Sequence, residues 1–302
     1  MLESPLLERL RRRFWWQIGD PLDRALGGAL RRRINAGRSY APIFVCGAMG
    51  GGTSLLAVQL GQRFECAGVA YESANDLPRD SFLHLSGPEA FPDVASYLEA
   101  LRPGADWRPE LGREALLDLY RASVWRRGDA VIDKGPNANL VRAGFLARCF
   151  PEARFVLIFR DPAANIEGFR RKWPSFGAAP IAQCVDFWSQ IHRAFLSASA
   201  RFASRSWIVD YADLVARNEA TLAALASRLG LRAANVPRRL RARGNLEGRG
   251  IRNVSGRDVG VVDDADARAR ARLGDLACTE IDTALAPLLS ELRSSPRRVG
   301  KA

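Results

Sequence analysis

Residues 43–56 decide the fold class and read Ile43-Phe44-Val45-Cys46-Gly47-Ala48-Met49-Gly50-Gly51-Gly52-Thr53-Ser54-Leu55-Leu56. An apolar run typical of a buried strand leads directly into a loop with four glycines in six positions, and two leucines then open a helical pattern. Because glycine has no Cβ, such a loop can curl with its N–H groups pointing inward. These donors and the positive end of the helix dipole predict a site for a phosphate or sulfate group.

The loop has the G-x-x-x-x-G spacing of a P-loop, with one replacement that changes its chemistry. Thr53 stands where a nucleotide triphosphatase has its lysine. Without that lysine nothing in the loop holds a γ-phosphate, so the sequence predicts a ligand with fewer phosphates. The hydroxyls of Thr53 and Ser54 would add donors. The alternative is a flexible glycine turn that binds nothing.

Outside the loop, short apolar segments alternate with helical patterns. We expect strands at 42–47, 67–71, 129–133, 154–159 and 206–210, and helices at 53–64, 139–150, 181–202 and 211–229. This alternation predicts an α/β, P-loop-like three-layer fold with a central parallel sheet of about five strands and helices on both faces. We place the domain at residues 41–295, after a basic segment at residues 1–40.

Composition narrows the functional class. The chain has 302 residues, of which 47% are hydrophobic and 26% charged, as in a globular protein. No apolar run approaches the roughly 18 residues of a membrane span, and no secretory signal is visible, so we expect a cytoplasmic protein. The chain has five cysteines, an odd number, and no two of them have the spacing of metal ligands. We therefore expect reduced thiols and no metal.

The net charge of +12 comes almost entirely from arginine. No basic stripe interleaved with aromatic residues accompanies it, so we do not expect a nucleic-acid partner. An anionic small ligand or an anionic surface fits equally well. Residues 1–40 hold nine arginines against four acids, with Phe14, Trp15 and Trp16 beside a cluster of them. This segment predicts either peripheral membrane contact or an amphipathic helix packed on the domain.

Four separated stretches resemble, in order, the sulfotransferase family. They are Gly47…Gly52-Thr53-Ser54-Leu55-Leu56, Asp133-Lys134-Gly135-Pro136, Arg154-Phe155-Val156-Leu157-Ile158-Phe159-Arg160-Asp161-Pro162, and Tyr211-Ala212-Asp213-Leu214-Val215 with Thr221-Leu222 and Leu229-Gly230-Leu231. The resemblance implies a fold that binds 3′-phosphoadenosine-5′-phosphosulfate (PAPS) and needs no metal. It also implies transfer of a sulfuryl group to a hydroxyl or amine of a carbohydrate, lipid or small metabolite, with adenosine 3′,5′-bisphosphate (PAP) as product.

The resemblance also assigns binding residues. Arg160 would hold the 3′-phosphate, with pairing to Asp161 as the alternative. Arg249 loosely matches a basic segment that folds over the nucleotide, and a solvated basic loop is equally compatible with the sequence. The 5′-phosphosulfate group would bind the loop residues Gly50, Gly51, Gly52, Thr53 and Ser54.

Candidate catalytic residues follow the predicted strands. Lys134 is one of only three lysines and ends the third strand, where a flexible ammonium can follow charge onto the leaving phosphate. A structural pair with Asp133 or Asp161 is the alternative, although we expect Asp133 to orient Lys134. For the base we favour Glu72, with its pKa raised in a partly dry cleft, over the rival His84. The alternative for Glu72 is a surface glutamate with no role in catalysis. We expect His192 to be a packed helix residue.

Two positions depart from the family pattern. Gly50 stands where these loops usually carry lysine or arginine, and Gly168 where the 3′-phosphate serine lies, eight residues after the arginine. Each replacement would remove a charge-assisted hydrogen bond of about 1.5–3 kcal/mol. A nearby basic run could compensate: Arg170, Arg171 and Lys172.

The sequence leaves the acceptor and two other functions open. We expect residues 73–128 to shape the acceptor pocket, with Trp107 and Trp125 as contacts. One alternative function is a non-catalytic nucleotide-binding or membrane-associated scaffold of the same fold. A P-loop kinase is the other, since residues 130–133 resemble a magnesium-binding strand end, but the loop lacks the lysine needed for phosphoryl transfer from ATP.

Overall fold

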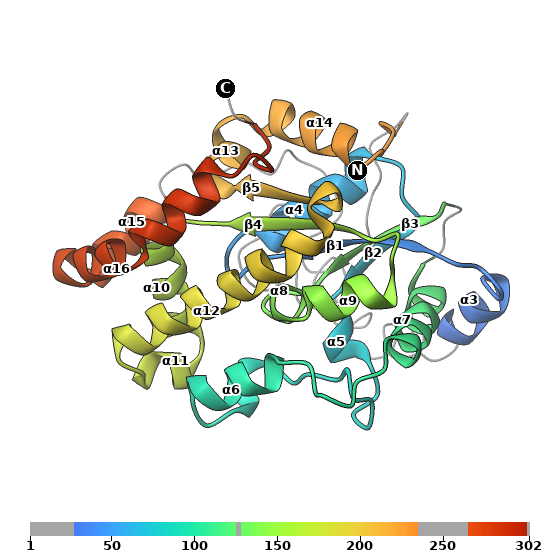
Figure 1. Ribbon diagram of the computed structural model, residues 1–302, viewed down its shortest axis with the longest axis horizontal. Helices are drawn as coiled ribbons and strands as arrows, with labels where there is room; N and C mark the ends of the chain where they lie inside the picture. Colours follow the sequence, from blue (N-terminus) through green and yellow to red (C-terminus); the bar gives the residue numbers. More distant parts are fainter. Residues whose placement is uncertain (1–26, 125–127, 235–264, 301–302) are drawn as a thin grey trace, which may run out of the picture.

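A five-stranded parallel sheet in the order β2-β3-β1-β4-β5 forms the centre of the molecule (Figure 1). The computed structural model describes residues 27–124, 128–234 and 265–300. Each strand lies within one residue of its predicted segment, so the predicted α/β fold class is confirmed. The strands are β1 (Ala41–Cys46), β2 (Gly68–Tyr71), β3 (Ala130–Lys134), β4 (Arg154–Phe159) and β5 (Ser206–Asp210).

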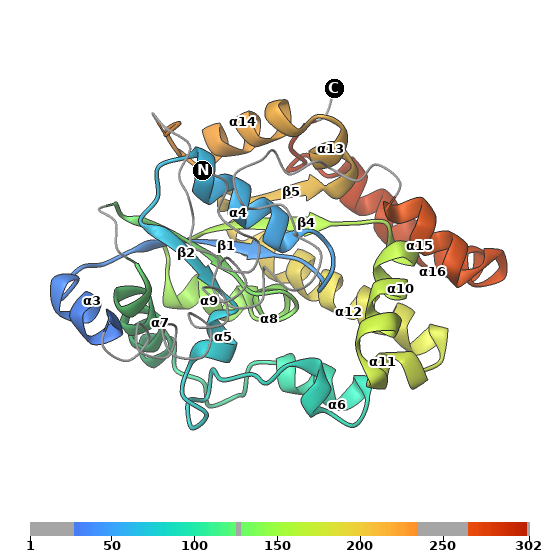
Figure 2. The ribbon, with the colours of Figure 1, turned by 180° about the vertical axis from the view of Figure 1, so that it is seen from behind.

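Helices cover both faces of this sheet (Figures 1 and 2). In the described ranges the α-helices are α3 (Gly28–Ile34), α4 (Thr53–Arg63), α5 (Ser73–Asp76), α6 (Val94–Leu101), α7 (Pro109–Ser123), α8 (Ala138–Val141), α9 (Ala143–Cys149), α10 (Pro162–Lys172), α11 (Pro174–Ala178), α12 (Ile181–Ser199), α13 (Tyr211–Ala216), α14 (Asn218–Arg228), α15 (Ala265–Leu273) and α16 (Asp275–Ser294). The same described ranges also contain two 3-10 turns, η3 (Pro88–Ala90) and η4 (Ala200–Arg205).

Two predicted helices are broken. The segment predicted at 139–150 forms α8 and α9, with Arg142 between them in a non-helical conformation. The segment predicted at 211–229 forms α13 and α14, which meet at Arg217, where φ is −133° and ψ is 48°. The helix predicted at 181–202 ends at Ser199 and continues as the 3-10 turn η4.

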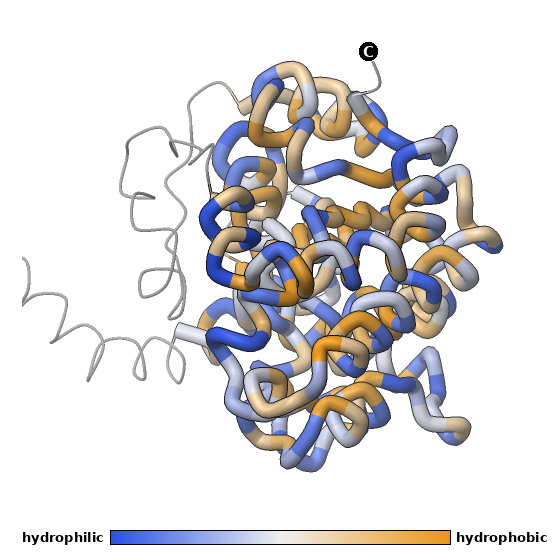
Figure 3. Tube along the Cα trace, turned by 90° about the vertical axis from the view of Figure 1, so that its left-hand side faces the viewer, coloured by the Kyte–Doolittle hydropathy of each residue, from blue (hydrophilic) through white to orange (hydrophobic). Residues whose placement is uncertain are grey.

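Alternate residues of each strand pack into two separate cores, because successive side chains of a strand point to opposite faces. Phe44 stacks on Phe155 at 5.2 Å in the core shared with α7, α9 and α12. Ile43 and Val45 enter the second core, beneath α4 and α14. In Figure 3 many of the orange, hydrophobic segments lie in the middle of the fold. Burial on both faces explains why these strands are almost continuously apolar.

The carboxyl ends of β2, β3 and β1 lie side by side. Tyr71 of β2 is the register partner of Lys134 of β3, and Lys134 is the partner of Val45 of β1. On the other side of β1, Cys46 pairs with Leu157 of β4. The glycine-rich loop and the residues that end β2, β3 and β4 therefore share one edge of the sheet, where parallel α/β sheets bind their ligands.

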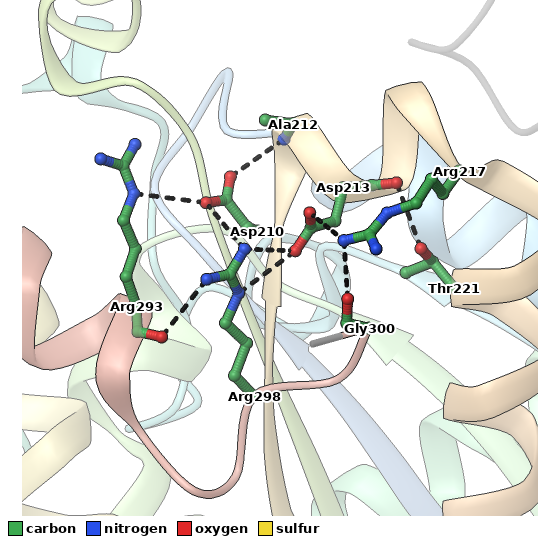
Figure 4. A network of polar contacts seen from close by, with 8 residues as sticks. All are labelled: Asp210, Ala212, Asp213, Arg217, Thr221, Arg293, Arg298 and Gly300. Atoms are coloured by element: carbon green, nitrogen blue, oxygen red, sulfur yellow. Dashed lines mark hydrogen bonds and ion pairs between the residues drawn. The ribbon is translucent and has the colours of Figure 1, made fainter. Parts of the chain in front are cut away.

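The C-terminal tail covers the edge strand β5. The N–H of Val299 donates to the Ile208 carbonyl at 2.8 Å, and the N–H of Ile208 donates to the Arg297 carbonyl at 3.1 Å. Arg298 donates to Asp213 at 2.6 Å and lies 3.8 Å from Asp210 (Figure 4). The two bonds of Ile208 satisfy backbone groups that an edge strand would otherwise expose.

The basic N-terminal segment is described only from residue 27. Its helix α3 packs on α7, and Asn35 donates to the Val124 carbonyl at 2.9 Å. Phe14, Trp15 and Trp16 lie outside the described residues, so the boundary at residue 40 and the membrane contact stay predictions. Within the described ranges, none of the helices has the length and apolar character of a membrane span.

Candidate active site at the carboxyl edge of the sheet

The glycines of the loop are required by its geometry. Gly50 and Gly52 have φ of +75° and +98°, in the left-handed region that side chains disfavour. A Cβ on Gly47 would lie 2.6 Å from the Ile158 carbonyl oxygen, and one on Gly52 would lie 2.5 Å from the Tyr211 ring. The loop therefore packs too tightly on β4 and Tyr211 for any larger residue at these two positions.

Two buried asparagines hold the loop from either side, and the sequence analysis missed both. The Asn137 N–H donates to the Gly47 carbonyl at 2.9 Å, and its side-chain oxygen accepts from the Met49 N–H at 3.0 Å. From α10, the Asn165 amide donates to the Met49 carbonyl at 2.7 Å and accepts from the indole of Trp188 at 3.1 Å. The one signal for Asn137 in the sequence was its place directly after Lys134-Gly135-Pro136. Its φ there is +60°, a conformation that asparagine tolerates better than most residues.

Several backbone donors of the loop have no acceptor among the described residues. Among the hydrogen bonds of the described residues, none uses the N–H of Gly50 or Gly52. The N–H groups of Thr53 and Ser54 open α4, and donors in a first helical turn have no intrahelical partner. The N-terminus of α4 also lacks a side-chain cap. The loop can therefore donate several hydrogen bonds to one oxyanion.

The candidate cation and the candidate base form an ion pair. Lys134 Nζ lies 2.7 Å from Glu72 Oε1, with 5% of the Lys134 side chain exposed and 39% of the Glu72 side chain. Glu72 follows β2 with φ of +52° and precedes α5, and its backbone N–H donates to the Lys134 carbonyl. The two strand ends thus place both charges beside the loop. Asp133 and Asp161, the partners considered from the sequence, do not take this ammonium.

The predicted rise in the pKa of Glu72 is wrong for this arrangement. Partial burial works to raise the pKa, but the charge and hydrogen bond of Lys134, together with the charge of Lys172, outweigh burial. The pKa of Glu72 is therefore lower than usual, and the side chain is a carboxylate stabilised by its cation. The sequence indicates partial burial of Glu72 but not the opposite charge that the fold places beside it.

Asp133 does not orient Lys134, in contrast to the prediction. Its carboxylate accepts from the Tyr120 hydroxyl at 2.6 Å, on the opposite face of β3 from Lys134, as alternation along a strand requires. Burial raises the pKa of Asp133. Glu72 takes the orienting contact that had been assigned to Asp133.

Arg160 extends from the end of β4 to the loop. Its Nη1 donates to the Gly50 carbonyl at 3.0 Å, and the guanidinium lies 4.9 Å from the centroid of the Tyr211 ring. Its Nε donates to Asp266 of α15 at 2.6 Å. Asp161, the alternative partner of Arg160, instead accepts from Arg270 at 2.8 Å. A strong anion-binding group therefore borders the loop on the side of β4.

Comparison with known proteins assigns the family. A family model described as "Sulfotransferase family" matches residues 42–235. The chain belongs to the sulfotransferase family. Sulfotransferase STF1 from Mycobacterium tuberculosis H37Rv is 16% identical with a TM-score of 0.50, covering 91% of this chain and 81% of its own. The sulfotransferase domain of the Synechococcus PCC 7002 olefin synthase is 17% identical with a TM-score of 0.47, covering 83% of this chain and 96% of its own. No curated protein sequence matches the chain.

In this sulfotransferase the two histidines have different surroundings. His84 Nδ1 lies 2.9 Å from the Leu77 carbonyl, and among the described residues its side chain contacts neither the loop nor Lys134. It belongs to the segment that follows α5, so it stays a rival candidate for the base. His192 is fully buried in α12 with its ring 3.8 Å from that of Trp188, and burial lowers its pKa to about 4. The expected packed helix residue is confirmed.

Of the three basic residues proposed to compensate for missing phosphate contacts, Arg170 already has another role. Its guanidinium donates to the carbonyls of Gly177 and Phe176 and so caps the end of α11. Arg171 lies 3.3 Å from Glu167 with an exposed side chain. Lys172 lies 4.0 Å from the centroid of the Trp173 ring, and its charge acts on Glu72. Lys172 is thus on the side of the Lys134–Glu72 pair.

The glycines that depart from the family pattern differ in their surroundings. A Cβ on Gly168 would have nothing within 4 Å, so a serine would fit there. At Gly50 the positive φ disfavours any side chain, and a Cβ would lie 3.3 Å from the Asn165 amide nitrogen. Arg249 and Trp125 lie outside the described residues. Trp107, which belongs to the segment predicted to shape the acceptor pocket, packs on Phe145 with 5.2 Å between the ring centroids.

Proposed function

We propose that this sulfotransferase moves a sulfuryl group from PAPS to a hydroxyl or amine of a carbohydrate, lipid or small metabolite, and releases PAP. One observation carries the proposal. The glycine-rich loop, whose N–H donors include several without an acceptor among the described residues, lies beside the Lys134–Glu72 pair at one edge of the sheet. A loop without its own lysine suits a donor with one 5′-phosphosulfate group better than a triphosphate. We also propose a cytoplasmic location, with residues 1–40 as the contact to a membrane surface.

The donor's two anionic ends are bound by separate groups in this proposal. Gly50, Gly51 and Gly52 with Thr53 and Ser54 hold the 5′-phosphosulfate. Arg160 holds the 3′-phosphate in a bidentate contact, and Arg249 adds a second cation from a segment outside the described residues. Gly168 supplies no hydroxyl. Arg160 therefore provides a larger share of the 3′-phosphate recognition than the corresponding arginine does in a family member with serine at this position.

Lys134 and Glu72 share the chemistry. As the acceptor oxygen or nitrogen bonds to sulfur, the bond between sulfur and the bridging phosphate oxygen breaks, and Lys134 neutralises the charge that develops there. Glu72 accepts the proton that leaves the acceptor hydroxyl or amine. When Lys134 turns from Glu72 to the donor, the contact that lowers the pKa of Glu72 is lost, so its basicity rises at that moment. His84 is the second candidate for this proton.

Nucleotide binding tests the donor assignment. PAP and AMP differ only in the 3′-phosphate, so calorimetric titration of the full chain with each should give about 10- to 100-fold tighter binding of PAP. Arg160→Ala should remove this preference. Arg193→Ala, an exposed arginine on the outer side of α12, removes the same charge away from the site and should retain it.

The outcomes separate the proposal from its competitor. Equal affinity of the parent for PAP and AMP would remove the donor assignment. Tight PAP binding without transfer from PAPS to any acceptor or to water would favour the non-catalytic nucleotide-binding scaffold, which the two missing contacts at Gly50 and Gly168 make a specific alternative.

A further inference from the structure

Helix α15 brings an acid to the arginine that we propose for the 3′-phosphate. Asp266 lies in the first turn of α15, and its Oδ1 accepts from Arg160 Nε at 2.6 Å. The Nη2 of the same guanidinium also contacts this carboxylate oxygen. The contact joins residues 106 positions apart, because α15 packs along α10, the helix that follows Arg160.

The guanidinium of Arg160 is already engaged on several sides. Nε and Nη2 face Asp266, Nη1 donates to the Gly50 carbonyl, and the plane lies over the ring of Tyr211. The pair is largely shielded, with 17% of the Arg160 side chain and 31% of the Asp266 side chain exposed. A phosphate that uses the fork of this guanidinium needs N–H groups that Asp266 now occupies, and two anions repel at such a distance.

The rest of α15 is held independently of Arg160. Arg270 donates to Asp161 at 2.8 Å and also pairs with Asp282 of α16. Arg272 donates to Glu167 at 2.6 Å, and Ala269 is buried. With these contacts in place, Asp266 can leave Arg160 by a change of its own side chain while the helix stays docked.

We propose that Asp266 is an internal competitor for the 3′-phosphate of the donor nucleotide, and hence a residue that sets nucleotide affinity; this inference rests on the proposed function. In the absence of nucleotide the carboxylate occupies the N–H groups of Arg160. A nucleotide with a 3′-phosphate displaces it, and one without a 3′-phosphate has no reason to do so. PAP carries the same phosphate as PAPS, so Asp266 also speeds product release by reclaiming the guanidinium.

The direction of the effect distinguishes competition from support. If Asp266 competes, its removal strengthens PAP binding. If Asp266 instead positions Arg160 for the phosphate, its removal weakens PAP binding. Asp266→Asn keeps the size of the side chain, while it removes the charge that competes.

The experiment is calorimetric titration of the full-length Asp266→Asn variant with PAP and with AMP at one fixed ionic strength. We expect PAP to bind about fivefold tighter than to the parent, as removal of a competing, partly exposed ion pair predicts, and AMP to bind unchanged. PAP should also dissociate more slowly in stopped-flow displacement. The matched control is Asp282→Asn. It removes the acid that pairs with Arg270 and leaves Arg160 and its contacts unchanged, so it should bind PAP as the parent does.

The same titrations separate failure of this inference from failure of the proposed function. If the parent prefers PAP over AMP and Arg160→Ala loses that preference, the donor assignment stands, and unchanged or weaker PAP binding by Asp266→Asn overturns the competitor role alone. If the parent shows no preference for PAP, both fall. A thermal melt of each variant verifies that it is folded under the titration conditions.

Discussion

At the scale of single residues, burial of a neutral imidazole couples stability to pH. His192 Nδ1 lies 2.7 Å from the Trp188 carbonyl, and its Nε2 is among the buried side-chain atoms that lack a partner in the described part of the chain. Burial lowers the pKa of His192 to about 4, so the ring stays neutral in the folded protein. The unfolded chain takes up this proton near pH 6.5, the usual value for histidine.

We predict that His192 destabilises the protein as the pH falls from 6.5 to 4. In this window the unfolded chain binds more protons than the folded chain, so the free energy of unfolding decreases, by about 3 kcal/mol in total. His192→Phe keeps a ring against Trp188 and removes the proton. Denaturant melts at a series of pH values should show a constant difference between parent and variant above pH 7. Below pH 6.5 the difference should shift toward the variant, and parallel curves down to pH 4 would refute the coupling.

From the sequence, three charged side chains of the candidate site could be singled out, but not the two asparagines that hold its loop. Lys134 stood out because nearly all other cationic side chains of the chain are arginines. Glu72 and Arg160 stood out because each follows a predicted strand. Asn137 and Asn165 could not be singled out, because an asparagine side chain gains its role only from the groups that the fold sets against it. The predicted rise in the pKa of Glu72 was wrong for the same reason, since the shift depends on the contact with Lys134, which lies on a neighbouring strand.

At the scale of elements, α10 carries the position where the family resemblance implies the 3′-phosphate serine. Gly168 lies inside this helix, and a Cβ there meets no atom within 4 Å. Glycine in a helix interior costs roughly 0.5–1 kcal/mol relative to alanine. The position therefore has both the space and the energetic reason to accept a side chain.

We predict that Gly168→Ser stabilises the fold by a few tenths of a kcal/mol and binds PAP about 10-fold tighter. The serine hydroxyl would donate to the 3′-phosphate, a contact that AMP lacks. Gly168→Ala is the matched control, since it gives the same backbone gain without a hydroxyl. Thermal melts and PAP titrations of the three proteins measure both effects. Equal PAP affinity of the serine and alanine variants would show that this position does not reach the phosphate.

The sequence predicts the strands better than the helices for a physical reason. Buried parallel strands are short apolar runs, so their limits are visible locally. The breaks at Arg142 and Arg217 depend on partners far along the chain. Arg142 donates to the carbonyls of Leu83, Ala100 and Leu101, and Arg217 donates to the Gly300 carbonyl, so tertiary contacts stabilise the turns that interrupt these helices.

At the scale of the whole molecule, the residues of the candidate site come from four strand ends and one helix near the C-terminus. The loop follows β1, Glu72 follows β2, Lys134 ends β3 and Arg160 follows β4, while Asp266 arrives from α15. The parallel order of the sheet made the first four predictable as neighbours. The approach of α15 was not predictable, because nothing in the local pattern of residues 265–273 indicates which face of the sheet edge they will cover.

The central claim of this account is that sulfuryl transfer takes place where Lys134 meets the glycine-rich loop. Lys134→Ala tests it. Glu72 is partly exposed and can be hydrated once its partner is gone, so the variant should fold and bind PAP with an affinity close to that of the parent. Loss of a cation that stabilises transition-state charge should lower turnover by about 100- to 1000-fold.

The deciding measurement is the rate at which the parent and Lys134→Ala convert PAPS to PAP, in water and with a panel of hydroxyl and amine acceptors. We predict conversion by the parent and a loss of at least about 100-fold in the variant, with PAP binding and thermal stability retained. Conversion by the variant at the parental rate would contradict the account.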